Sequence, residues 1–337
     1  MKKIAIVGAG AWGTALATVA ARAGREVVIW AREPDVADDI NRRHRNALFL
    51  PGVNLDAAIA ATTDLAMVGD ADAVLLVVPA QFLRGVGEAL RQFLGAGTPV
   101  VICAKGIEKS SLKLMTEVVT ETLPEAPLAV LSGPTFAAEV ARGLPTAITL
   151  ACADAGVGSR LIEALGQPSF RPYLSADPIG AEIGGAVKNV LAIAAGIAHG
   201  GKLGENARAA LIARGMAEML RLGRAKGARI ETLMGLCGLG DLILTCSSEQ
   251  SRNMSLGAAL GRGERLTDIL AARHTVAEGV ATAQAVSALA GALAIEMPIC
   301  DAVNRILHHG SDVDAVIHEL TTRPFRVETT GEPLADL

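Results

Sequence analysis

A glycine-rich turn directly behind an apolar strand constrains the fold of this chain more than any other feature. The apolar residues 4–7 run into the segment GAGAWG at 8–13, and an Ala-rich helix is expected over residues 14–23. Gly8 permits a tight turn, and Gly13 permits close packing of the helix on the strand. These residues predict a strand–turn–helix unit that opens a βαβ fold.

The same turn has the chemistry of a phosphate-binding site. Gly10 has no side chain that would keep a pyrophosphate away from the backbone. The N–H groups at the start of the following helix carry a partial positive charge and are free to bind an anion. We therefore expect Gly8, Gly10 and Gly13 to bind a dinucleotide. A tight turn without any ligand is the alternative.

The length of 337 residues predicts two domains, because one nucleotide-binding domain takes about 100–200 residues. Continuous apolar strands alternate with helical stretches in the first half of the chain, which predicts an open, mostly parallel sheet covered on both faces. Segment 33–60 is more polar and irregular. The expected strands cover residues 4–7, 27–30, 73–78, 100–103, 129–131, 147–151 and 170–174.

The pattern changes after Asp177-Pro178. From Ile183 onward, apolar residues recur at three- and four-residue spacing, which is typical of helices, and no convincing strand follows. The expected fold is a Rossmann-type, doubly wound α/β domain over residues 1–178, followed by an all-helical C-terminal domain over residues 179–337. We expect a loosely held tail from about residue 321, where prolines and a glycine interrupt the sequence.

Charge and cysteine usage narrow the classes of partner. The net charge of −4 gives no global field that would attract nucleic acid or an anionic membrane, so local basic residues must hold any anionic ligand. The five cysteines form no CxxC pair, which favours reduced thiols in a cytoplasmic protein without a metal. No stretch reaches the roughly 18 uninterrupted apolar residues of a membrane span. The apolar helical domain favours a homodimer.

A lysine in an apolar helix is the first candidate for chemistry. Lys188 is followed by Asn189 and lies among small residues. Such a lysine either extends outward to water or is held in a site that lowers its pKa. In a site, it would donate a proton to a carbonyl oxygen while a hydride reaches the carbon, and would take the proton back in the reverse direction. Asn189 would assist it.

A carboxylate and a hydroxyl stand four residues apart in the segment 238–245. If this segment is helical, Asp241 and Thr245 face the same side. Asp241 would then pair with Lys188 and hold it charged and oriented. The alternative is that Asp241 caps a helix that starts at Leu242; both roles are compatible.

Two basic positions suit phosphate groups. Arg32 follows the second strand, where an arginine suits the 2′-phosphate of NADP, although the neighbouring Glu33 keeps NAD open and a solvated surface arginine is the alternative. In Ser251-Arg252-Asn253, a guanidinium flanked by a hydroxyl and an amide suits a phosphate, which accepts several directed hydrogen bonds. Taken alone, this tripeptide could equally cap a helix.

Two further segments lie where ligands bind in open parallel sheets. Lys105 follows the strand expected at 100–103, and the turn Gly133-Pro134-Thr135 follows the strand expected at 129–131. Ligands of such sheets sit beyond the carboxyl ends of the strands. Both segments are therefore expected at the same edge of the sheet.

These motifs together resemble a known family. The sequence is similar to the bacterial NAD(P)-dependent glycerol-3-phosphate dehydrogenases from its first strand to about Pro298. The segments that carry the resemblance are GAGAWGTALA, AKGIE at 104–108, LSGPTFAAEV at 131–140, IGGAVKNVLAIAAG at 183–196, GLGDLILTC at 238–246 and QSRN at 250–253. The combination of SGPTFA, GGAVKN and GLGDL is far more specific than the glycine turn.

The resemblance implies reversible reduction of dihydroxyacetone phosphate to sn-glycerol 3-phosphate for phospholipid synthesis, with NADP or NAD as cofactor. It makes Lys188 the proton donor and acceptor. The implied substrate contacts are Lys105, Gly133, Thr135, Lys188, Asp241, Ser251, Arg252 and Asn253, to which we add the polar neighbours Asn189 and Thr245. The implied cofactor contacts beyond the glycines are Ala11, Trp12, Arg32, Lys105, Ala137, Arg252, Val276 and Glu278. Position 11 is often serine in the family, so Ala11 removes one side-chain hydrogen bond.

Two other functions are compatible with a dinucleotide-binding domain. A 3-hydroxyacid dehydrogenase of the same two-domain plan also has a lysine here, but its asparagine lies four residues later, where this chain has Ala192. A non-catalytic NADP-binding sensor would keep the glycines but has no reason to keep Lys188, Asp241 and Arg252 together. Both alternatives are therefore disfavoured.

Overall fold

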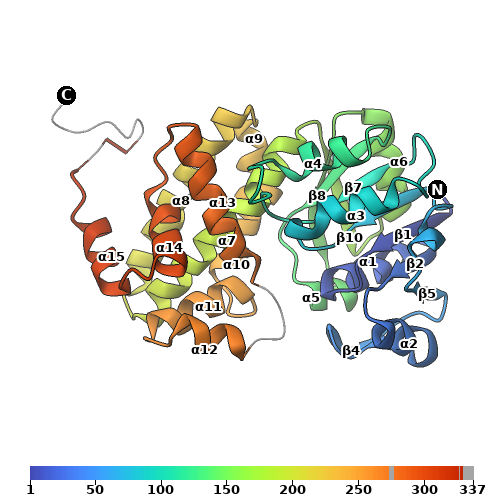
Figure 1. Cartoon of the computed structure of the whole chain (residues 1–337), viewed down its shortest axis with the longest axis horizontal. Coiled ribbons are helices and arrows are strands. Elements are labelled where there is room, and N and C mark those ends of the chain that lie inside the picture. The colour runs from blue at the N-terminus through green and yellow to red at the C-terminus, as the bar shows by residue number, and fades with distance from the viewer. Residues whose placement is uncertain (273–276, 326, 329–337) are drawn as a thin grey trace.

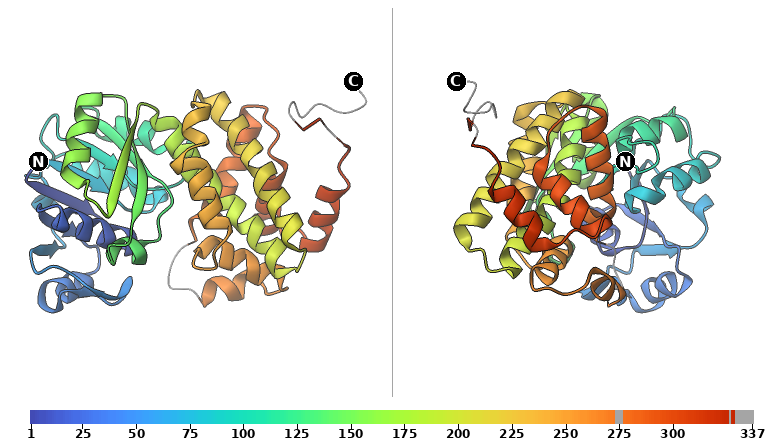
Figure 2. Two further views of the ribbon diagram at one scale, coloured as in Figure 1. Left: turned by 180° about the vertical axis from the view of Figure 1, so that it is seen from behind. Right: turned by 60° about the vertical axis from the view of Figure 1, so that its left-hand side comes forward.

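The computed structural model describes residues 1–272, 277–325 and 327–328. Figure 1 shows two lobes side by side along the long axis, a sheet lobe coloured blue to green and a helical lobe coloured yellow to red. The views in Figure 2 show the same division. The expected fold class, a Rossmann-like sheet followed by a helical domain, is confirmed.

The first lobe is built on an eight-stranded sheet in the order β10-β9-β8-β7-β6-β1-β2-β5. Only β8 and β9 pair antiparallel; the other neighbours in this sheet are parallel. The strands are β1 (Lys3–Val7), β2 (Glu26–Trp30), β5 (Ile59–Thr62), β6 (Ala73–Leu76), β7 (Val100–Ile102), β8 (Leu128–Ser132), β9 (Thr146–Cys152) and β10 (Phe170–Ser175). The expected mostly parallel sheet is therefore present.

Both faces of the sheet are buried, which explains its continuous apolar strands. Ile4 and Ile6 of β1 enter one apolar core, and Ala5 and Val7 enter the other. The first core is covered by α1 (Ala11–Arg22), α2 (Pro34–Arg43), α5 (Ala137–Ala141) and α6 (Ala155–Leu165). The second is covered by α3 (Leu83–Leu90) and α4 (Met115–Thr122), with the 3₁₀ turns η1 (Leu65–Val68) and η2 (Ala80–Phe82) nearby.

Several boundaries differ from those expected. The irregular segment 33–60 contains α2, the β3 (Arg45–Asn46) and β4 (Leu50–Asn54) hairpin, and the start of edge strand β5. The strand expected at 73–78 ends at Leu76, because Val77 and Val78 pass the glycine turn in close contact with Gly8. The first helix begins at Ala11 rather than residue 14, because Gly10 occupies its N-cap position.

The second lobe is helical throughout its described residues, as expected after residue 179. It comprises α7 (Pro178–Gly200), α8 (Glu205–Lys226), α9 (Ile230–Leu233), the π-turn η3 (Leu236–Gly240), α10 (Asp241–Cys246), α11 (Arg252–Gly261), α12 (Leu266–Ala271), α13 (Glu278–Ala292), α14 (Pro298–His308) and α15 (Val313–Thr321). The expected tail begins where α15 ends. Most of that tail, residues 326 and 329–337, lies outside the described residues.

The central helix α7 is surrounded by the rest of the lobe. Asp177 caps its start by accepting a hydrogen bond from the Gly180 N–H, and Pro178 occupies the first turn. Its backbone touches that of α11: a Cβ on Gly196 would lie 2.1 Å from the Met254 carbonyl oxygen. By length and composition α7 could cross a membrane, but the window concerned is wholly buried in the described structure, as in the core helix of a globular lobe.

Candidate active site

Lys188 lies in the middle of α7 with its ammonium group inside the protein. Its side chain is 7% exposed. Nζ donates hydrogen bonds to Oδ1 of Asp241 at 2.6 Å and to Oγ1 of Thr245 at 2.8 Å. Burial lowers the pKa of Lys188 to about 8; Asp241 opposes this shift, and the charge of Lys105 adds to it. The Lys188 side chain is therefore held inside a site and does not extend outward to water.

Asp241 joins two lysines from different lobes. Its carboxylate is fully buried; Oδ1 accepts from Lys188 and Oδ2 accepts from Nζ of Lys105 at 2.6 Å. The predicted pairing with Lys188 is present, whereas the bond to Lys105 was not anticipated. Thr245 lies one turn later on the same side of α10, and its hydroxyl is 3.3 Å from Oδ1 of Asp241.

Asp241 does not cap a helix, which was the alternative role for this residue. The π-turn η3 leads directly into α10, so Gly240 takes the N-cap position and Asp241 is already helical. Its side chain is thereby directed toward the lysines and away from the backbone N–H groups.

The sheet edge contributes Lys105 and the Gly133 turn, as expected from their positions after β7 and β8. Lys105 Nζ donates a hydrogen bond of 3.3 Å to the Gly133 carbonyl oxygen, and the Thr135 hydroxyl donates to the same oxygen at 3.3 Å. A Cβ on Gly185 of α7 would lie 2.9 Å from the Ser132 hydroxyl and 3.3 Å from Lys105 Cγ. The carboxyl edge of the sheet therefore abuts α7 beside Lys188.

A chain of amides connects α7 to α11 and α13. Asn189 Nδ2 donates to the Gly185 carbonyl oxygen at 3.3 Å, and its Oδ1 accepts from Asn253 Nδ2 at 2.9 Å. Asn253 Oδ1 accepts from the Gly279 N–H at 3.0 Å. Each amide group keeps one further N–H for a ligand. The two asparagines therefore hold the start of α13 close to the lysine helix.

Ser251 and Arg252 begin α11. The Ser251 hydroxyl accepts a hydrogen bond from the Met254 N–H at 3.2 Å. Ser251 therefore caps α11, which was the alternative role for this tripeptide. Glu278 begins α13, and burial raises the pKa of its carboxyl group, while the charges of Arg252, Lys105 and Lys188 oppose that rise. These charged groups therefore share one electrostatic neighbourhood.

The glycine turn fits a dinucleotide. A Cβ on Gly13 would lie 1.8 Å from the Gly8 carbonyl oxygen, so only glycine allows α1 to approach β1 this closely. Gly8 has a φ of +120°, which side chains rarely adopt. Gly10 faces open space, and no side chain of the described residues caps the N–H groups of α1. The turn is thus free to receive an anionic group.

The remaining expected cofactor residues differ in their burial and contacts. The Trp12 indole Nε1 is buried and has no hydrogen-bond partner within the described part of the chain. The Arg32 side chain is 74% exposed and pairs with Glu33 at 2.7 Å. Ala137 is the first residue of α5. Val276 lies outside the described residues.

One residue that supports the site was missed. Asn46 is buried, and its Nδ2 donates to the Ala9 carbonyl oxygen and to the Thr14 hydroxyl, both at 2.8 Å. It therefore supports the glycine turn from the β3–β4 hairpin.

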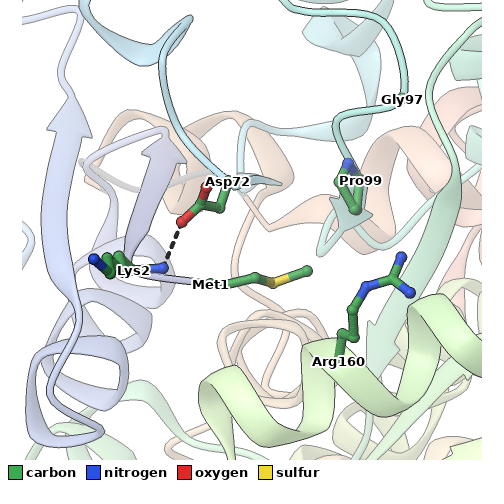
Figure 3. Close-up of a pocket in the computed structure, with 6 residues that line it drawn as sticks. All are labelled: Met1, Lys2, Asp72, Gly97, Pro99 and Arg160. Atoms are coloured by element: carbon green, nitrogen blue, oxygen red, sulfur yellow. Dashed lines mark hydrogen bonds between the residues drawn. The ribbon is translucent and has the colours of Figure 1, made fainter.

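A hollow of about 420 Å³ lies elsewhere, at the amino edge of the sheet (Figure 3). Its lining residues Lys2, Asp72 and Pro99 precede β1, β6 and β7. The Asp72 carboxylate already accepts the backbone N–H groups of Lys2 and Lys3. The lysine cluster, at the opposite edge, is the better candidate for catalysis.

Comparison with known proteins identifies the family of the chain. Residues 3–157 match the family model of the NAD-dependent glycerol-3-phosphate dehydrogenase N-terminus, and residues 177–318 match that of the C-terminus. The chain is 61% identical to "Glycerol-3-phosphate dehydrogenase [NAD(P)+]" of Parvibaculum lavamentivorans, covering 97% of this chain and 98% of that protein. It is 59% identical to the protein of that name from Maricaulis maris, with the same two coverages.

A solved structure gives the same result in three dimensions. The crystal structure of glycerol-3-phosphate dehydrogenase from Coxiella burnetii is 43% identical and superposes with a TM-score of 0.92, covering 96% of this chain and 99% of that chain. Both lobes are included in the match. This chain therefore belongs to the NAD-dependent glycerol-3-phosphate dehydrogenase family.

Proposed function

We propose that this chain reversibly reduces dihydroxyacetone phosphate to sn-glycerol 3-phosphate, with NADP or NAD as cofactor. The observation that carries the proposal is the buried Lys188–Asp241–Lys105 cluster, which lies where the carboxyl edge of the sheet meets the helical lobe. The family relatives are named for this activity. The product supplies the backbone of phospholipids.

Lys188 has the proton that the reaction needs. A pKa of about 8 leaves its ammonium group mainly protonated at neutral pH, yet able to lose the proton easily. Two of its three N–H bonds are directed to Asp241 and Thr245, so one remains for the ketone oxygen. When bound, the nicotinamide cofactor supplies the hydride. The ammonium charge stabilises the oxygen as it becomes an alkoxide.

The other polar residues bind and orient the substrate in this proposal. Arg252, beside Ser251 and Asn253, would hold the phosphate, because a guanidinium matches phosphate geometry. The remaining proposed contacts are Lys105, Gly133, Thr135 and Asn189, with Thr245 acting on Lys188. The cofactor phosphates would lie at Gly8, Gly10 and Gly13, beside Ala11 and Trp12, with Ala137, Arg252, Val276 and Glu278 as further contacts.

A direct assay tests the activity. Purified protein with dihydroxyacetone phosphate should oxidise NADPH or NADH, followed by absorbance, and should react far more slowly with a ketone that lacks the phosphate. Binding of NADPH without turnover would instead support the sensor. Preference for a 3-oxo acid over dihydroxyacetone phosphate would support the 3-hydroxyacid dehydrogenase, which the family match disfavours.

The rate should depend on pH in opposite ways for the two directions. Reduction requires protonated Lys188, so its kcat should fall about tenfold per pH unit once the pH exceeds a midpoint near 8. Oxidation requires the neutral amine and should rise through the same midpoint. Steady-state rates in both directions between pH 6 and roughly pH 10 measure this. Parallel profiles in the two directions would contradict the role of Lys188.

The choice between the two cofactors is assigned to Arg32. In Arg32→Ala, the KM for NADPH should rise about tenfold, because a charge-assisted contact to the 2′-phosphate is lost, while that for NADH stays unchanged. Arg42→Ala is the matched control, since Arg42 is similarly exposed on α2. An equal change in the KM values for NADPH and NADH would mean that Arg32 does not contact the 2′-phosphate.

Domain division, assembly and location complete the proposal. We place the domain boundary between residues 178 and 179, next to the start of α7 at Pro178. The five cysteines are free and buried, which is consistent with a cytoplasmic enzyme. A homodimer is consistent with the apolar composition of the helical lobe. Light scattering of the purified protein would give the oligomeric state.

A further inference from the structure

The segment between Lys105 and α4 belongs to the sheet lobe in sequence but packs in the helical lobe. Ile107 and Leu114 are completely buried in the apolar core that surrounds α7. They face each other in an antiparallel bridge, which closes the intervening loop. We call residues 105–117 the Lys105 segment. Because Ile107 and Leu114 of this segment are buried in the helical lobe, the position of Lys105 depends on both lobes.

The chain next to Lys105 is tightly enclosed. A Cβ on Gly106 would lie 2.8 Å from the Ala80 Cβ on one side and 3.5 Å from the Thr282 hydroxyl on the other. Ala80 belongs to the sheet lobe, and Thr282 belongs to α13 of the helical lobe. The backbone at residue 106 therefore passes through a narrow space between the lobes.

Gln81 holds the Lys105 segment by its main chain. Gln81 Nε2 donates to the Ile107 carbonyl oxygen at 2.8 Å, and its Oε1 accepts from the Lys109 N–H at 3.1 Å. The Gln81 amide therefore makes the two main-chain hydrogen bonds, one on each side of residue 108, that a neighbouring β-strand would otherwise make. This pairing uses both polar atoms of the Gln81 side chain and fixes the loop on the side of the sheet lobe.

A partly buried ion pair fixes residue 108 of the same segment through its side chain. Arg84 on α3 binds both carboxylate oxygens of Glu108 at 2.9 Å, and the Ser111 hydroxyl donates to the same carboxylate. Arg84 also pairs with Glu121 of α4 at 2.9 Å. The arginine holds the pKa of the Glu108 carboxyl below its usual range. Bidentate geometry makes this pair directional as well as strong.

The far end of the segment is attached to the helix that carries Lys188. The Thr116 N–H and hydroxyl donate to the Glu182 carboxylate of α7 at 2.7 and 2.6 Å. Lys226 of α8 pairs with Glu117 at 3.1 Å. The two lysines that share Asp241 are therefore connected through a second, independent route.

We propose that Gln81 and the Arg84–Glu108 pair are positioning residues, which hold Lys105 against Asp241 for the reaction described above. The inference rests on the proposed function. A lysine side chain has several rotatable bonds, so its 2.6 Å contact with Asp241 persists only if its backbone is fixed. Displacements of about 1 Å at a reacting group can cost about a hundredfold in rate. None of the three residues needs to touch the substrate.

The test is Gln81→Met, which keeps the length of the side chain and removes both hydrogen bonds. The kcat for dihydroxyacetone phosphate should fall about tenfold, and the dissociation constant of NADPH should change less than about twofold. Gln81→Glu keeps the acceptor for Lys109 but sets a charged carboxylate oxygen against the Ile107 carbonyl oxygen, so its loss should be at least as large. Gln92→Met, at an exposed glutamine beyond α3, is the matched control.

A pH profile separates positioning from a general structural effect. Lys188 faces Asp241 of α10, Lys105 of the segment and Glu278 of α13, with the Cys246 thiol nearby. Since the charge of Lys105 lowers the pKa of Lys188, retreat of Lys105 should move the pH midpoint of kcat upward. Arg84→Lys, which retains the charge but loses the two-point contact, should shift it in the same direction.

Each outcome decides the matter. Lower kcat with a raised midpoint in Gln81→Met or Arg84→Lys supports positioning. Wild-type kcat, or a lower kcat with an unshifted midpoint, overturns it. If Gln81→Met does not fold, as judged by thermal unfolding, Arg84→Lys gives the answer. Absence of turnover in the wild-type protein refutes the proposed function and this inference with it, whereas turnover that Gln81→Met retains in full refutes this inference alone.

Discussion

Lys188→Met is expected to lower turnover of dihydroxyacetone phosphate by about 10²–10⁴-fold, the range lost when a general acid is removed. Methionine keeps the apolar length of the side chain but has no proton to donate and no charge to stabilise an alkoxide. Steady-state kinetics measure the effect. NADPH affinity, measured by fluorescence titration, should be largely spared, because the glycine turn lies in the other lobe.

The stability of the same variant distinguishes a catalytic lysine from a structural one. Asp241 would retain its 2.6 Å pair with Lys105, so the substitution leaves no isolated buried charge. The free energy of unfolding should therefore stay within about 1 kcal/mol of wild type or rise, because a desolvated ammonium group has been removed. Lys188→Ala should lose activity similarly. Near-normal turnover in either variant would rule out the proposed mechanism.

Asp241→Asn should affect stability and activity together. The substitution keeps the shape of the side chain but leaves the buried Lys188 and the partly buried Lys105 without their counter-charge. Removing one partner of a buried ion pair typically costs about 3–5 kcal/mol, so the urea midpoint should fall clearly. The pKa of Lys188 should fall further, which leaves the amine neutral at pH 7 and unable to donate a proton in the reduction.

The control is Asp314→Asn, at an exposed position in the first turn of α15, which should change neither property measurably. For Asp241→Asn itself, raising the pH should relieve part of the destabilisation, because folding requires Lys188 to release a proton that the unfolded chain still holds, and this release becomes easier as the pH rises. Unfolding curves at pH 7 and roughly pH 9.5 measure this recovery. An Asp241→Asn protein with wild-type stability at pH 7 would show that the carboxylate does not compensate the two charges.

The sequence supported the sheet well because strands buried on both faces are continuously apolar. Strand β1, for example, alternates between two cores without any polar residue after Lys3. The β3–β4 hairpin was not anticipated, because its main contribution is made at long range: Asn46 reaches Ala9 and Thr14, more than thirty residues earlier. One asparagine in a polar segment carries no signal of such a contact.

The site was predictable where spacing within a helix decides the geometry. Asp241 and Thr245 share a face because they are four residues apart, and Lys188 stood out because an apolar helix surrounds it. The bond between Lys105 and Asp241 joins two lobes, and no local pattern connects residues 136 positions apart. Gln81 was missed for a similar reason. It binds main-chain atoms of a distant segment, and such a contact produces no periodic pattern in the sequence.

The central helix α7 has a consequence for how the protein is made. Its 23 residues leave the ribosome before α8, α10, α11, α13 and α14, the helices that later surround it. Until those helices have been synthesised, this apolar rod, which has the composition of a membrane span, can be covered only by the earlier elements that it contacts, α4, β8 and β9. Biogenesis of the enzyme therefore has to keep this rod from aggregation and from the membrane-insertion machinery until the last covering helix, α14, has been completed at His308.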